Sequence, residues 1–234
     1  FDPNDYKPQI IQAVKDSKQR TLHLDGDIKL SFFPDIGANL SRVSLSEFRS
    51  EKEFAAIESA RVSLAFMPLL RKQLVVNEVA VSGLTATLVK HKDGSTNIDD
   101  LLAKDEKQAE AQPAASSQPM KFDIASVSLD KANFTYRDEA TGAQYALKNL
   151  GLKTGRIADG IPSKIDFAAN IEANRPKLDI ETQMKAMLSF SLENKSYKVS
   201  GLDFQAKGAV LDIGNLVVQA SGDASANLAT QEFA

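Results

Sequence analysis

The sequence predicts a mainly β protein, in which a long, curved antiparallel sheet forms a groove and a short amphipathic helix caps its N-terminal end. Three observations predict this class. Apolar and polar residues alternate over most of the 234 residues, which is the period of a half-buried strand. The alternation over residues 178–192 is far longer than a usual strand of about 5 to 6 residues. Only two short segments have helical spacing, so helices cannot cover the sheet.

The predicted helix lies at the start of the chain. Pro8 suits a first helical turn because its φ is fixed, and Ile10, Ile11 and Val14 recur at helical spacing, with Tyr6 one turn earlier. This pattern predicts a helix of about three turns.

From residue 22 the apolar period changes to two. Leu22, Leu24, Ile28 and Leu30 then share one face of a strand. Gly26 interrupts this row, and we expect a bend or bulge there. The helix and the first strand should therefore meet at one edge of the sheet.

The later strands follow one another with short turns between them. A short helix over 98–102, which Asn97 is expected to cap, separates two groups of strands. In chain order the strands are predicted at residues 40–45, 57–66, 74–88, 122–129, 134–136, 145–152, 165–171, 178–192, 199–204 and 216–228. The longest would extend on the order of 50 Å.

The chain divides in sequence at a segment with little to bury. Residues 103–121 are mostly Ala, Gln, Glu, Lys, Ser and Pro, which predicts a mobile linker or loop. Residues 1–102 then hold the helix and the first meander, and residues 122–234 continue the same sheet.

A short apolar pattern recurs in which a step of three interrupts the period of two. A β-bulge produces this step, since its extra residue returns the next side chain to the same face; chance recurrence is the alternative. The pattern is found at Leu40/Val43/Leu45, Ile57/Ala60/Val62, Val76/Val79/Val81, Ile124/Val127/Leu129, Leu147/Leu150/Leu152 and Val199/Leu202/Phe204.

The alternating strands leave one apolar face uncovered by helices. The sheet can close as a sandwich, or it can curl into a trough whose apolar interior binds a ligand. The very long strands favour the trough, but composition does not decide between the two.

Composition also excludes several function classes. The net charge is −3, the pI is near 5.5 and no basic run is present, which argues against nucleic acid as a partner. The chain has no cysteine, and its two histidines, His23 and His91, lie far apart in the sequence. A thiolate metal site, a histidine metal cluster and a histidine-based triad therefore lack their parts. No nucleophile elbow, Walker loop or dinucleotide motif occurs. We expect no enzyme activity, no cofactor and no metal.

Two acidic clusters have the residue types of a calcium site. Asp25-Gly26-Asp27 is better explained by a bulge with solvated carboxylates, and residues 97–100 by a helix cap. No run of 18 apolar residues occurs, so no segment is predicted to span a bilayer. Because the sequence begins with Phe1 and not methionine, we expect an upstream segment.

Several stretches together resemble the AsmA family of bacterial envelope proteins. Two departures are Ser41-Arg42, where members often have Gly and an acidic or amide residue, and Ile98, where they often have Trp. The stretches are FDPNDYKPQI (1–10), LDGDIKLSFFPDIG (24–37), VSLSE (43–47), MPLL (67–70), VAVSGLTATLVK (79–90), DGSTNIDDLL (93–102) and FDIASVSLDKANFTYRD (122–138).

The resemblance implies a transmembrane helix before Phe1 that anchors the protein in the inner membrane, a periplasmic location, and more β structure after Ala234. In the related bridge-like lipid transfer proteins, a helix-and-strand unit caps a long β-groove along which lipids travel. The resemblance therefore implies transport of phospholipid towards the outer membrane, with a protein partner there or in the periplasm. Burial of acyl chain is favourable by about 0.8 kcal/mol per CH₂.

On this interpretation the apolar faces of the strands bind phospholipid acyl chains. Tyr6, Ile10, Ile11 and Val14 of the helix either gate the end of the groove or are ordinary core filling. The predicted lining consists of Leu22, Leu24, Ile28, Leu30, Val62, Leu64, Phe66, Leu84, Leu88, Phe134, Ile165, Phe167, Ile171, Leu178, Ile180, Met184, Leu188 and Phe190.

An alternative function is a structural or assembly factor for outer-membrane protein biogenesis. It predicts a closed β-sandwich with a sealed core and a partner surface on the outward strands. A hydrolase is the third class and has no candidate catalytic residues.

Overall fold

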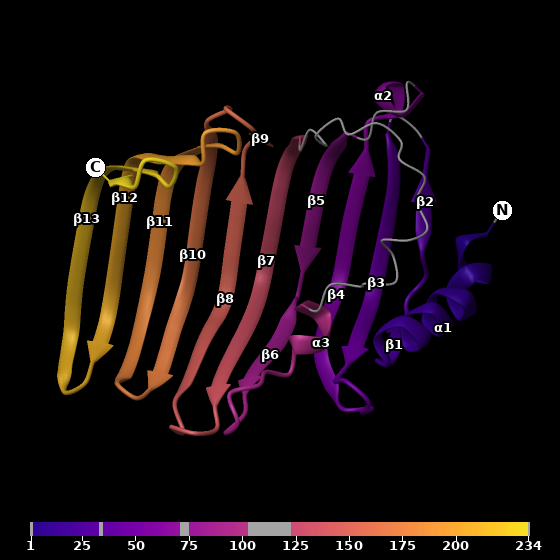
Figure 1. Ribbon diagram of the computed structural model, residues 1–234, viewed down its shortest axis with the longest axis horizontal. Helices are drawn as coiled ribbons and strands as arrows, with labels where there is room; N and C mark the ends of the chain where they lie inside the picture. The colour runs from indigo at the N-terminus through magenta and orange to yellow at the C-terminus, as the bar shows by residue number, and fades with distance from the viewer. Residues whose placement is uncertain (1, 33–34, 71–74, 103–122, 234) are drawn as a thin grey trace.

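The strands of the protein form one continuous sheet. The computed structural model describes residues 2–32, 35–70, 75–102 and 123–233, and the predicted linker at 103–121 lies outside them. The sheet has 14 strands in the order β1-β3-β4-β5-β7-β8-β10-β11-β12-β13-β14, with β2, β6 and β9 paired beside this path. Figure 1 shows the strands standing side by side in a single layer. The predicted fold class is confirmed in its mainly β character, its one large sheet and its short N-terminal helix.

The helix and the first strands lie at one end of the sheet. The elements here are η1 (Pro3–Tyr6), α1 (Lys7–Lys18), β1 (Leu22–Leu24), β2 (Lys29–Ser31) and β3 (Ile36–Ser46). α1 packs beside β1. The bend predicted at Gly26 is present between β1 and β2, and the Gly26 amide donates to the Ser41 carbonyl at 3.1 Å.

Three predictions in the next stretch are wrong, and one of them is the strand predicted at 74–88, which is two strands with Gly83 and Leu84 between them. Its elements are β4 (Glu53–Leu64), α2 (Phe66–Leu70), β5 (Val76–Ser82), β6 (Thr85–Lys90) and α3 (Asp99–Leu102). Phe66 is not in a strand but begins α2, a turn that contains Pro68, which cannot donate a ladder hydrogen bond. Asn97 does not cap α3, because its side chain accepts from the Val89 amide and donates to the Thr87 carbonyl.

The strands of the second half are long. β11 has 15 residues, so it extends about 50 Å, as its alternation predicted. β7 is a single strand where two were predicted. The elements are β7 (Asp123–Asp138), β8 (Gln144–Thr154), β9 (Ile157–Ala158), β10 (Ser163–Asn174), β11 (Lys177–Ser191), β12 (Ser196–Val210), β13 (Ile213–Asn227) and β14 (Glu232–Phe233).

The sheet is mixed, whereas the sequence predicted an antiparallel one. β5 and β6 follow one another along a single line, and both pair with β7 in parallel. The other strand pairings are antiparallel among the described residues. β7 begins beside the start of β5 and ends beside the end of β6, an arrangement that a tight turn cannot produce because parallel neighbours need a longer crossover connection.

The recurrent step of three marks real kinks in the strands. Arg42, Asn149 and Gly201 occupy the skipped positions in three of the predicted patterns, and their left-handed φ angles are 49°, 49° and 60°. The strand register shifts beside Asn149 and beside Gly201, as a bulge requires. The bulge interpretation is confirmed at these two places.

The sheet does not close into the sandwich that the alternative predicted. The described strands belong to one sheet, so no second sheet packs against its apolar face. Buried apolar residues in the described chain are alanines and one leucine, Leu150. Small side chains are buried because larger neighbours on the same face shield them, and Ala132, Leu150 and Ala169 form the most buried such cluster.

Candidate functional site

One face of the sheet carries apolar side chains across almost its whole width. Directly paired residues of neighbouring strands lie on the same face, so the strand registers define rows that run across the strands. One row, from β3 to β13, consists of Leu40, Ala60, Val81, Leu129, Leu152, Phe167, Met184, Phe204 and Ala220. We call the face that holds this row the apolar face.

A second row runs nearer the other end of the strands. It consists of Leu22, Leu45, Ala55, Ala86, Phe134, Leu147, Ile171, Ile180, Gly208 and Leu216. Most residues of both rows are half-buried. A single layer of side chains shields itself only partly, and water remains in contact with the apolar face.

The opposite face is polar. Lys153, Asp166, Lys185 and Asp203 form a row of directly paired residues with alternating charge, and these side chains are exposed. Opposite charges on paired strand positions stabilise a solvated sheet face. The alternation along the strands thus separates an apolar face from a polar one.

Most of the predicted lining residues lie on the apolar face. Leu22, Phe134, Phe167, Ile171, Ile180 and Met184 belong to the two rows, and Leu188 and Phe190 continue the alternation along β11. Three predicted residues lie outside the strands. Ile28 precedes β2, Leu84 lies between β5 and β6 and packs against the buried cluster, and Phe66 belongs to α2.

The remaining lining residues also fall in strands of this face. Leu24 pairs with Val43, Leu30 with Ala38, and Ala38 in turn with Val62. The others are Leu64 on β4, Leu88 on β6, Ile165 on β10 and Leu178 on β11.

The predicted cap residues divide into two pairs on α1. Ile11 and Val14 are half-buried, on the side of the helix that packs on the sheet. Tyr6 and Ile10 are 50% and 41% exposed. α1 therefore lies along the edge of the sheet with one narrow apolar stripe inward.

A pocket of about 350 Å³ lies on the apolar face beside α3. Its walls are Ala86, Leu88, Phe134, Leu147 and Ile171 from the strands and Ile98 from the turn before α3, together with Phe54, Tyr136 and Tyr145. The rings of Tyr136 and Tyr145 stack with centroids 6.1 Å apart. The sequence analysis missed Phe54, Ile98 and both tyrosines, although Tyr136 and Tyr145 continue the alternation of their strands.

Arg20 is the largest fully buried side chain in the described part of the chain, with 0% exposure. Its guanidinium donates to both carboxylate oxygens of Asp100 at 2.7 and 2.6 Å, to the Ser46 carbonyl at 2.9 Å and to the Asn97 carbonyl at 2.6 Å. Hydrogen bonding from Arg20 lowers the pKa of Asp100, since it stabilises the carboxylate. A lone arginine between a helix and a strand gives no periodic signal, and the sequence analysis missed it.

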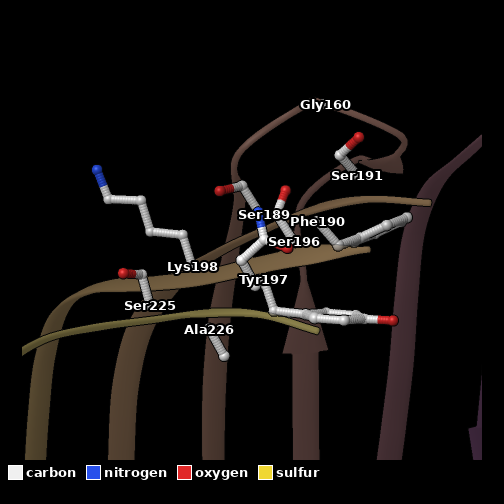
Figure 2. A pocket seen from close by; sticks show the side chains of 10 residues that line it. Gly160, Ser189, Phe190, Ser191, Ser196, Tyr197, Lys198, Ser225 and Ala226 are labelled. Atoms are coloured by element: carbon white, nitrogen blue, oxygen red, sulfur yellow. The ribbon is translucent and has the colours of Figure 1, made fainter. Parts of the chain in front are cut away.

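A second hollow among the described residues lies at the far end of β11, β12 and β13. It has a volume of about 670 Å³ and is lined by serine, asparagine and lysine side chains with Phe190 and Tyr197. Figure 2 shows Phe190 and Tyr197 extending in one direction and Lys198 in another. The strand register agrees, because Phe190 pairs with Tyr197 on the apolar face while Ser189 pairs with Lys198 on the polar face.

The acidic clusters have structural partners. Asp100 is paired with Arg20, and Asp99 accepts from the Thr96 amide and hydroxyl at the start of α3. Among the described residues, no three His, Asp or Glu side chains gather as a metal site would require. None of the described helices is long and apolar enough to cross a bilayer.

Comparison with known proteins matches residues 1–231 to the AsmA family. The chain belongs to the AsmA family. It is 20% identical over 215 residues to Protein AsmA of Escherichia coli strain K12, a match that covers 88% of this chain and 34% of that protein. The chain thus spans about a third of this AsmA relative. No solved structure matches. AsmA family membership indicates an envelope-associated protein.

Proposed function

We propose that this chain carries phospholipid along its apolar face, as the periplasmic part of an AsmA protein that is anchored in the inner membrane and delivers lipid towards the outer membrane. The observation that carries the proposal is the pair of apolar rows that cross the sheet, which no second sheet covers among the described residues. An acyl chain on this face replaces water and is stabilised by about 0.8 kcal/mol per buried CH₂.

The polar face fits the same function. Its exposed charged rows keep one side of the sheet in water, so lipid is held on the other side only. Movement of lipid along the rows requires no bond to be made or broken, and we propose that the chain works without catalysis and without a cofactor.

The test compares two adjacent residues of β11 that face opposite ways. A photo-crosslinking amino acid at Leu188, on the apolar face, should capture phospholipid, and the same group at Ser189, on the polar face, should not. Leu188→Asp should remove bound phospholipid from the purified chain while Ser189→Asp retains it, with both variants folded by circular dichroism.

Lipid extraction and mass spectrometry of the purified chain give the result independently of the crosslinker. Absence of phospholipid, together with no capture at Leu188, would contradict the proposal. Capture of a protein at Leu188 in place of lipid would favour the assembly-factor function.

A further inference from the structure

The apolar pocket beside α3 has one wall that the sheet does not supply. Ile98 comes from the turn before α3 and lines the pocket together with strand residues such as Leu88. The position of Ile98 therefore determines whether the pocket is closed on that side.

Arg20 holds the chain on both sides of Ile98. Its Nη2 donates to the carbonyl of Asn97 and to the carboxylate of Asp100, each at 2.6 Å, and its Nε donates to the second carboxylate oxygen at 2.7 Å. Two residues that flank the wall are thus bound by one buried guanidinium. A bidentate arginine–carboxylate pair fixes geometry as well as charge.

Asn97 fixes the same turn to the sheet. Its side chain accepts from the Val89 amide at 2.9 Å and donates to the Thr87 carbonyl at 2.8 Å and to Glu47 at 2.9 Å. The backbone before Ile98 is therefore bound to β6 on one side and to Arg20 on the other.

Phe54 connects Arg20 to the pocket itself. The guanidinium carbon lies 4.9 Å from the centroid of the Phe54 ring, and Phe54 also lines the pocket. Arg20 therefore orients two of the pocket walls without touching the space between them.

The chemistry of the lining identifies the occupant. The described side chains around the pocket are hydrocarbon except for Thr135 and the two tyrosines, and the Tyr145 hydroxyl already donates to the Arg175 carbonyl at 3.1 Å. A peptide would bury backbone polar groups here with few hydrogen-bond partners, which is unfavourable for each group left unpaired. A hydrocarbon chain carries no such groups.

We propose that this pocket is a discrete binding site for one acyl chain, and that Arg20 is the positioning residue that holds Ile98 and Phe54 as its walls. The proposal rests on the proposed function, because the pocket is part of the same apolar face. It adds that acyl chain binds more tightly here than elsewhere on the face.

The chain contains no tryptophan, so one introduced indole is a clean fluorescent reporter. Tyr145→Trp places it at the pocket, and Tyr197→Trp places it on the same face outside the pocket. Tyr145 and Tyr197 are a matched pair of positions, because they are 40% and 41% exposed. The probe is a fatty acid brominated near the middle of its chain, which quenches an indole on contact.

We expect saturable quenching at position 145 with a midpoint at least about tenfold lower than at position 197, which is a difference of about 1.4 kcal/mol. Equal midpoints at the two positions would overturn the discrete site and leave the proposed function intact. Absence of quenching at both positions would overturn both.

The role of Arg20 is tested in the two reporter backgrounds. Arg20→Met should raise the midpoint at position 145 about tenfold and leave the midpoint at position 197 unchanged. A general loss of structure would move both midpoints, so this difference separates positioning from folding. If Arg20→Met does not fold, Asp100→Asn, which keeps the side-chain shape, should give a smaller shift at position 145 alone. An unchanged midpoint at position 145 in the variant that folds would overturn the positioning role.

Discussion

At the scale of single residues, Gly26 shows how closely the bend between β1 and β2 approaches β3. A Cβ at this position would collide with the side chain and the backbone carbonyl of Ser41. We predict that Gly26→Ala lowers the free energy of unfolding by about 1 to 3 kcal/mol, because an added methyl without space forces the backbone apart.

The matched control for Gly26 is Gly214 of β13, where an added Cβ meets nothing within 4 Å. Gly214→Ala should change stability by less than about 0.5 kcal/mol. Denaturant unfolding followed by circular dichroism measures both. Equal changes in the free energy of unfolding for the two substitutions would show that the close contact with Ser41 does not destabilise Gly26→Ala.

Asp100 provides a residue-scale prediction about pH. Its pKa is lowered in the folded chain, mainly by hydrogen bonds from Arg20, so its contribution to stability is present above the carboxyl pKa of the unfolded chain, about 3.9. That contribution is lost as pH falls further, through the lowered pKa. Wild type should therefore lose stability more steeply below about pH 4 than Asp100→Asn does.

The neutral-pH result for Asp100 is part of the same prediction. Asp100→Asn should lower stability there by up to about 3 to 5 kcal/mol, because it leaves a buried guanidinium without its counter-charge. Parallel pH profiles of wild type and variant, measured by thermal unfolding from pH 7 to 2, would count against an ionised Asp100 as the partner of Arg20.

At the scale of elements, the apolar residues of α1 differ in burial, and this difference bears on whether they gate the end of the groove or fill the core. Ile11 and Val14 are half-buried against the sheet, whereas Ile10 is exposed. We predict that Ile11→Ala or Val14→Ala costs about 1 to 2 kcal/mol, less than a fully buried site, and that Ile10→Ala costs less than about 0.5 kcal/mol. Thermal unfolding measures these differences.

The same three variants distinguish a gate from core filling. If the stripe only fills the edge of the sheet, phospholipid bound per folded chain stays constant in all of them. A change in bound lipid in Ile10→Ala without a change in melting temperature would instead identify a gating role for the exposed side of α1.

The elements differ in how well the sequence predicts them, and the reason is the length of each periodic signal. β11 alternates over its whole length, and α1 repeats at helical spacing, so both were predicted. α2 has too few residues for a period, which is why Phe66 was assigned to the preceding strand. The parallel pairing of β7 depends on how the chain returns between β6 and β7, and side-chain alternation does not encode that return.

The residues of the candidate site also differ in how well the sequence predicts them. The apolar face follows from alternation, so most of its lining residues were predicted by number. The pocket beside α3 was not, because Arg20, Asn97 and Asp100 act through specific hydrogen bonds between segments about 80 residues apart in the chain. Tertiary hydrogen bonds of this kind leave no period in the sequence.

At the scale of the whole molecule, the apolar rows run across the strands, so the lipid path that we propose runs along the sheet and perpendicular to each strand. One row passes through Val81, Leu129, Leu152, Phe167, Met184 and Phe204. Each kinked strand keeps its apolar residues in register with its neighbours, since the bulge restores the face after the kink. The kinks therefore do not interrupt the row.

A charge in the middle of this row should divide the path. A photo-crosslinking amino acid at Val81 or at Phe204 reports phospholipid capture in cells on the two sides of Phe167. We predict that Phe167→Asp lowers this capture at least about tenfold at the position away from lipid entry, because a buried carboxylate against acyl chain costs several kcal/mol. Capture on the entry side should persist. The control is Ala168→Asp, which places the same charge on the exposed polar face of β10 and should leave capture at both positions unchanged. If Phe167→Asp folds and both positions still capture lipid at the level of Ala168→Asp, lipid does not pass along this row.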